Sequence, residues 1–114
     1  MESHIPTRQE ALALLKEFTQ GEGLIKHGLA VEAAMRYFAR QKGEDEEAWG
    51  IVGLVHDLDY EQFPREHCQK TQEILRERHW PEAYIRAIMS HGWGICTDVG
   101  PQSPMEKCFM RWMN

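Results

Sequence analysis

The chain has 114 residues, a length that suits one domain with a buried core of its own. Its content of 42% hydrophobic and 27% charged residues is typical of a globular protein and excludes a disordered one. The 13 basic and 18 acidic side chains give a formal net charge of −5, which argues against a surface that binds the phosphate backbone of a nucleic acid polymer.

The sequence also argues against a membrane or secreted protein. No apolar run approaches the roughly 18 residues of a membrane span. The first residues lack the basic and apolar regions of a signal peptide. The three cysteines form no CxxC pair, so we expect reduced thiols. Together these features predict a cytoplasmic protein with no membrane partner.

The hydrophobic spacing in the first half of the chain predicts helices and no strand. Thr7, followed three residues later by Glu10, is typical of a capping box at a helix start. A second helix is expected over about 24–41, where apolar residues recur at steps of three and four. The acidic run at 44–47 suits the start of a third helix, which should end near His56.

The second half of the chain predicts shorter helices joined by loops. Residues 58–64 are expected to form a loop, and so are residues 92–104, which contain several glycines and prolines. Pro81 suits the first turn of a helix, where its missing N–H costs nothing. Helices are expected over about 65–78, 81–91 and 105–113. We therefore predict one all-α domain spanning residues 1–114.

Four of the six histidines fall on the inward faces of four different predicted helices: His27, His56, His67 and His91. Taken singly, each could be a hydrogen-bonded core residue. Burying several imidazoles without partners costs free energy, and a divalent metal ion would give them a shared partner. Asp57 adds a carboxylate directly after His56, at a predicted helix end where both can reach one ion. Such ligands suit Mn, Fe, Co, Ni, Zn or Mg and exclude a thiolate zinc site.

The same residues resemble a known family. His27 followed by His56-Asp57 is similar to the H…HD signature of the HD-domain metal-dependent phosphohydrolases. Residues 66–75 and 88–91 resemble the family's next two histidine blocks, and residues 101–107 resemble the approach to its last ligand.

The resemblance implies an HD-like helical bundle with one or two metal ions between its helices. His27, His56 and Asp57 would be metal ligands, and His67 and His91 match histidines that bind a second metal or contact phosphate. It also implies hydrolysis of a small phosphorylated substrate, with nucleotides among the candidates. A metal centre suits this reaction, because it activates water and offsets phosphate charge.

The chain departs from the family pattern toward its end. The family's closing aspartate is expected about six to eight residues after Lys107 or a little before. Residues 108–114 contain no carboxylate side chain, and Met113 stands at the matching position. The domain is therefore expected to be shortened at its C-terminus. Asp98, in the preceding loop, is a candidate replacement ligand. Cys68 and Thr71 stand where the family usually has proline and glycine.

Two acidic residues follow the HD pair in the expected loop. Asp59 and Glu61 could position a water or act as acid or base, and the alternative is a pair of solvated loop carboxylates. We predict Asp57 and Asp59 as the catalytic residues.

Three functions stay open at this point. The first is an HD-type phosphohydrolase, and the second is a degenerate HD domain that binds metal, phosphate or nucleotide without catalysis. The third is a module that forms a homo-oligomer through its C-terminal helix, because that helix carries several large apolar residues: Phe109, Met110, Trp112 and Met113.

Overall fold

The computed structural model describes residues 4–90, 100 and 102–107, and all regular structure in that part of the chain is helical. This confirms the predicted all-α class. The elements are α1 (Arg8–Phe18), α2 (Glu22–Lys42), α3 (Glu46–Val55), the short 3₁₀ helix η1 (Pro64–Glu66), α4 (Gln69–Glu77) and α5 (Glu82–Ser90). Residues 104–107 add one helical turn. None of the described helices has both the length and the apolar character needed to cross a bilayer.

Local sequence signals set several helix ends. Thr7 is the N-cap of α1: its hydroxyl accepts the backbone N–H of Glu10 at 3.1 Å, and the Glu10 carboxylate accepts the N–H of Thr7 at 3.0 Å. This confirms the predicted capping box. Gly43 ends α2 with a φ of +68°, a conformation that glycine adopts without steric cost. Asp45 then caps α3 by accepting the N–H of Ala48.

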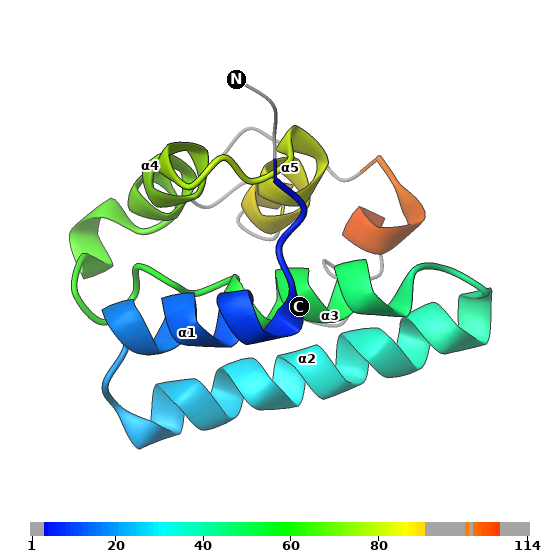
Figure 1. Cartoon of the computed structure of the whole chain (residues 1–114), viewed down its shortest axis with the longest axis horizontal. Coiled ribbons are helices and arrows are strands. Elements are labelled where there is room, and N and C mark those ends of the chain that lie inside the picture. Colours follow the sequence, from blue (N-terminus) through cyan, green and yellow to red (C-terminus); the bar gives the residue numbers. More distant parts are fainter. Residues whose placement is uncertain (1–3, 91–99, 101, 108–114) are drawn as a thin grey trace.

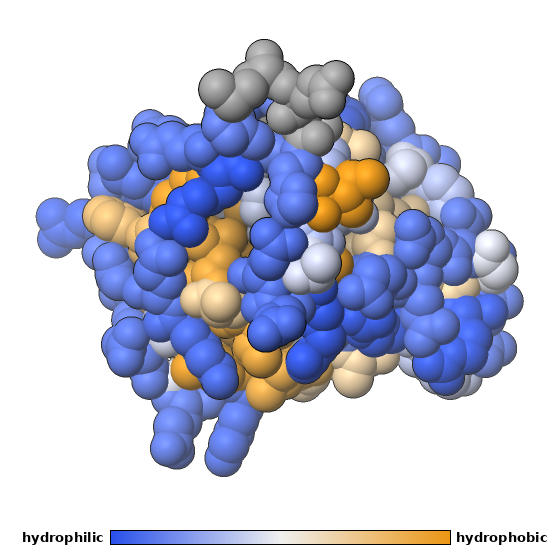
Figure 2. All heavy atoms as spheres, in the orientation of Figure 1, coloured by the Kyte–Doolittle hydropathy of each residue, from blue (hydrophilic) through white to orange (hydrophobic). Residues whose placement is uncertain are grey.

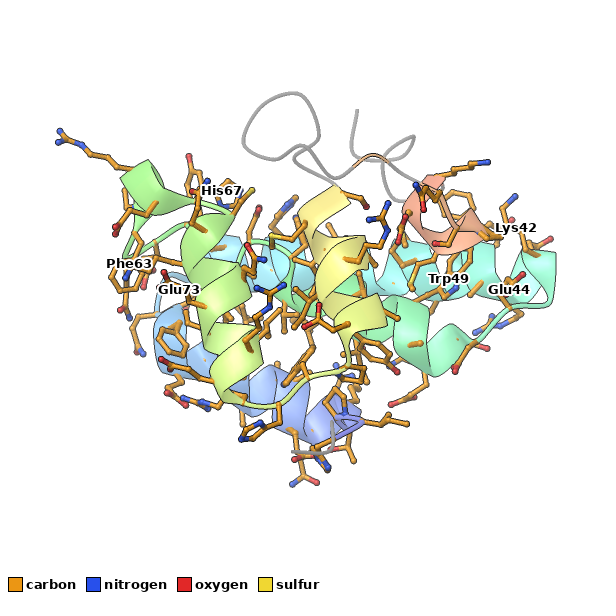
Figure 3. The ribbon with its side chains drawn as sticks, turned by 90° about the horizontal axis from the view of Figure 1, so that it is seen from above. Lys42, Glu44, Trp49, Phe63, His67 and Glu73 are labelled. Carbon is orange, nitrogen blue, oxygen red and sulfur yellow. The ribbon has the colours of Figure 1, made fainter. Side chains whose placement is uncertain are left out.

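Helix α3 is the centre of the fold. Figure 1 shows the long helix α2 along the base, with α1 and α3 above it and α4 and α5 above those. Helix α3 contacts α1, α2 and α5, and every residue from Ala48 to Val55 is buried. A helix that is apolar on all sides needs cover on all sides, which explains its central place. Seen from above in Figure 3, α4 and α5 lie side by side over this layer.

Two glycines let α2 and α3 approach closely. A Cβ atom on Gly28 would lie 2.9 Å from the carbonyl oxygen of Leu54, and one on Gly53 would lie 3.0 Å from that of Val31. Both neighbours are backbone atoms, so the helices would have to separate to admit a side chain. The close approach brings His27, which precedes Gly28, to the C-terminal end of α3.

The predicted helix over 65–78 is interrupted in the structure. It is divided into η1 and α4, because Cys68 has a φ of +78°, outside the helical region. Cys68 is buried and disulfide-bonded, so the expectation of reduced thiols is wrong for this residue. Farther along, Ile74 and Leu75 face the core of the domain, as their spacing predicts.

The face seen in Figure 2 is mostly hydrophilic, with apolar side chains exposed in smaller areas between the polar ones. Among the described residues, the large hydrophobic side chains that are exposed are Ile5, Leu29, Tyr37 and Tyr60. The predicted oligomer contact at 109–113 lies outside the described residues and stays a prediction.

Candidate metal centre

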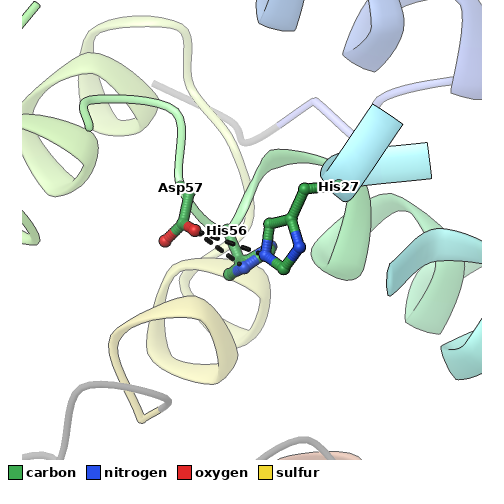
Figure 4. Close-up of side chains that lie close together, drawn as sticks. All are labelled: His27, His56 and Asp57. Carbon is green, nitrogen blue, oxygen red and sulfur yellow. Dashed lines mark ion pairs between the residues drawn. The ribbon is translucent and has the colours of Figure 1, made fainter. Parts of the chain in front are cut away.

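Three side chains meet where α3 ends. One ring nitrogen each from His27 and His56 and one carboxylate oxygen of Asp57 all lie within 4.8 Å of one another. Figure 4 shows the two rings and the carboxylate converging on one point. Oδ2 of Asp57 lies 3.6 Å from Nε2 of His27 and 3.2 Å from Nε2 of His56. This group could hold a divalent metal ion, because two imidazoles and a carboxylate are common ligands of such ions.

The end of α3 gives His56 and Asp57 their directions. The helix ends at Val55, His56 follows as its C-cap residue, and Asp57 lies in the turn after it, where both side chains reach the same point. His56 is buried, and its Nδ1 donates to the carbonyl oxygen of Gly53 at 2.7 Å. That bond places the Nε2 side of the ring toward Asp57. The side chains of His27 and Asp57 are 42% and 26% exposed, so the group is open to solvent on one side.

His67 approaches the group from the opposite side of Asp57. It lies between η1 and α4 (Figure 3). Its Nε2 is 3.4 Å from Oδ1 of Asp57, and its Nδ1 donates to Oδ1 of Asp59 at 2.5 Å. Asp57 therefore has His27 and His56 beside one oxygen and His67 beside the other. The other predicted ligands, His91 and Asp98, lie outside the described residues, as does Met113.

Asp59 is fully buried. Besides His67, it accepts the backbone N–H of Thr71 in the first turn of α4 at 3.0 Å. The alternative of a solvated loop carboxylate is therefore wrong for this residue. Its two contacts attach His67 and the start of α4 to the loop that follows α3. Sequence reasoning missed this role, because no short-range signal links Asp59 to residues 8 and 12 positions later.

Glu61 is also hydrogen-bonded to backbone N–H groups. Its carboxylate accepts the N–H groups of Gln20 and Gly21 at 2.8 and 2.7 Å, immediately before α2. Gly21 is the N-cap residue of α2, so Glu61, from a distant loop, holds the backbone at the point where α2 begins. This supports a role in holding the helix that carries His27, rather than acid or base chemistry.

Replacing Glu61 should test this role. Glu61→Ala is expected to lower the free energy of unfolding by about 1–2 kcal/mol, because two backbone N–H groups lose their hydrogen bonds to a charged acceptor. Urea denaturation would measure it, with Glu66→Ala as the control, because Glu66 is exposed in the same region. Unchanged stability in Glu61→Ala would contradict a role of Glu61 in holding the start of α2.

The hydrogen bond to Asp59 raises the pKa of His67 above its ordinary value of 6.5. The negative charges of Asp59 and Asp57 act in the same direction, and burial opposes them. A group whose pKa is raised by folding stabilises the folded state fully below its unfolded pKa. That contribution is lost as the pH rises through the folded pKa.

The metal-free protein should therefore lose stability as the pH is raised from 6 through the folded pKa of His67. We expect His67→Gln to remove this part of the pH dependence. Urea denaturation with a chelator present, at a series of pH values, would measure both proteins. Parallel pH profiles for the two would contradict the expectation.

No protein-family model, curated protein or solved structure matches the chain. The candidate metal centre is therefore defined by its side-chain geometry alone.

Proposed function

We propose that this chain is a metal-dependent phosphohydrolase of the HD type, acting on a small phosphorylated substrate such as a nucleotide. The observation that supports it most is the grouping of His27, His56 and Asp57 at one point. His27 lies 29 residues before His56 in the sequence, so chain proximity does not explain their meeting. This trio is also the ligand set that the resemblance to the HD-domain family implies.

His27, His56 and Asp57 would hold the first ion, which could be Mn, Fe, Co, Ni, Zn or Mg. When bound, such an ion lowers the pKa of a water and offsets the charge of a phosphate. Asp57 presents its second oxygen to His67, which would bind a second ion or contact a phosphate on the open side of the group. Asp59, buried behind His67, would act through that ring and would not touch the substrate.

The proposal is tested with protein stripped of metal and reloaded separately with each candidate ion. The substrates are p-nitrophenyl phosphate, bis-p-nitrophenyl phosphate and a panel of nucleotides. We expect metal-dependent turnover that falls at least 100-fold in the double variant His56→Ala/Asp57→Ala, which lacks two ligands. Turnover equal to that of the double variant with every ion and substrate would overturn the proposal.

A second candidate function is a non-catalytic HD-like domain that binds metal and phosphate. The lack of any carboxylate among residues 108–114 favours it, because the family pattern expects its last metal ligand there. Calorimetry with metal and inorganic phosphate separates the two functions. Phosphate binding that requires metal, without turnover, would support the second candidate.

We also propose a cytoplasmic location, with neither a membrane nor a nucleic acid polymer as partner. This rests on the composition and the net charge. The observation against it is the disulfide of Cys68, because cytosolic thiols are generally kept reduced.

A further inference from the structure

The three histidines around Asp57 all present the same ring nitrogen. Nε2 of His27 and of His56 lie beside one oxygen of Asp57, and Nε2 of His67 lies beside the other. A neutral imidazole carries one proton, and only the nitrogen without it can donate its lone pair to a metal. A working centre therefore needs each ring to keep its proton on Nδ1.

His67 meets this requirement through Asp59. A carboxylate accepts hydrogen bonds only, so in its bond to Asp59 at 2.5 Å the Nδ1 of His67 is the donor and carries the proton. His56 reaches the same state by donating from Nδ1 to the backbone oxygen of Gly53. Histidine rings that ligate metals commonly donate a hydrogen bond from their other nitrogen in this way. That bond fixes both the position of the proton and the orientation of the ring.

The carboxylate of Asp59 is itself fixed in place. It is completely buried, and its second oxygen accepts the N–H of Thr71. One oxygen is thus held by the backbone of α4 and the other by the ring of His67. Asp59 cannot turn toward a substrate without breaking both bonds.

We propose that Asp59 is a positioning residue that fixes the proton of His67 on Nδ1, so that Nε2 is offered to the metal centre beside Asp57. Its function in catalysis rests on the proposed phosphohydrolase activity. The fixed tautomer is a property of the metal-free protein and does not depend on that activity.

Asp59→Asn is the most direct variant, because it preserves the shape of the side chain. The Asn oxygen can still accept the N–H of Thr71, but its amide nitrogen then faces Nδ1 of His67. Two donors cannot bond, so the proton of the ring should move to Nε2 and block that nitrogen. The same exchange at a catalytic aspartate elsewhere is known to leave the geometry intact while selecting the wrong tautomer.

The first measurement is a long-range ¹H–¹⁵N correlation spectrum of the histidine rings, recorded with a chelator at a pH where they are neutral. The signals of His67 are assigned by their loss in His67→Gln. We expect the proton on Nδ1 in the native protein and on Nε2 in Asp59→Asn, with no change in Glu66→Gln, a neighbouring exposed carboxylate. A native His67 with its proton on Nε2, or a tautomer unchanged in Asp59→Asn, would overturn the proposal. The native tautomer is read without Asp59→Asn, so poor folding of that variant leaves the proposal open to refutation.

The second measurement is calorimetric titration with Mn²⁺, Co²⁺ and Zn²⁺. Asp59→Asn should weaken the binding that depends on His67 by 10- to 100-fold, the usual effect of losing such a partner. The double variant Asp59→Asn/His67→Gln should bind no more weakly than His67→Gln alone. Equal affinity of Asp59→Asn and the native protein would overturn the positioning role. The expected tautomers and affinities without any turnover would instead refute the phosphohydrolase activity and leave the positioning role supported.

Discussion

Adding a divalent transition metal to the metal-free protein is expected to raise its melting temperature by about 10 °C. A ligand present at 100 times its dissociation constant stabilises the folded state by about 2.7 kcal/mol. For a domain of about this length, each kcal/mol raises the midpoint by about 4 °C. The effect should be large because His27 and the His56-Asp57 pair come from separate parts of the chain, so the unfolded chain presents no assembled site.

Differential scanning calorimetry would measure this shift in the native protein and in two variants. Asp57→Asn weakens a ligand, and His56→Ala removes one, so both should lose most of the shift. His4→Gln is the matched control, because His4 is exposed and pairs with Glu10, away from the site. A shift that persists in both site variants would show that the metal binds elsewhere. No shift with any of Mn²⁺, Co²⁺, Ni²⁺ and Zn²⁺ would contradict the metal centre itself.

Replacing Gly28 is expected to damage both the fold and the metal centre. The Cβ atom of Gly28→Val would lie 2.9 Å from the carbonyl oxygen of Leu54 and 3.3 Å from the side chain of Leu15. The helices must then separate, at a cost of about 3 kcal/mol. His27 is the preceding residue, so the same movement should withdraw it from His56 and weaken metal binding.

Gly23→Val is a control within the same helix, because a Cβ atom on Gly23 would meet no atom within 4 Å. It should leave stability unchanged or raise it slightly, since valine favours a helix more than glycine does. Urea denaturation with a chelator and metal titration would measure both variants. Equal stability of Gly28→Val and the native protein would contradict the close approach of α2 and α3.

The parts of the fold that the sequence predicts well depend on contacts between residues that are close together in the sequence. The capping box of Thr7 and Glu10 spans one helical turn, and Gly43 ends α2 by its own backbone conformation. The break at Cys68 could not be predicted in this way. The first turn of α4 is capped by Asp59, 12 residues before the N–H that it accepts.

The residues of the candidate metal centre show the same difference between local and long-range contacts. The spacing of His27, His56 and Asp57 predicts that they meet, and the structure confirms a group that could hold an ion. Asp59 and Glu61 are noticeable in the sequence because they follow the HD pair. Their hydrogen-bond partners depend on how the loop after α3 packs against α4 and the start of α2, which no local pattern encodes. His91 and Asp98 stay predictions.

The different acceptors of His56 and His67 have a consequence for how this chain can change over evolutionary time. The acceptor of His56 is the backbone oxygen of Gly53, which does not depend on a side chain. The acceptor of His67 is the side chain of Asp59, and a single nucleotide change turns an Asp codon into an Asn codon. A side chain at Gly53 would push α2 and α3 apart, so a change there disturbs the fold as a whole, whereas Asp59→Asn changes the acceptor of His67 alone. In a lineage under relaxed selection, we expect the contribution of His67 to decay first, while the His27, His56 and Asp57 group persists.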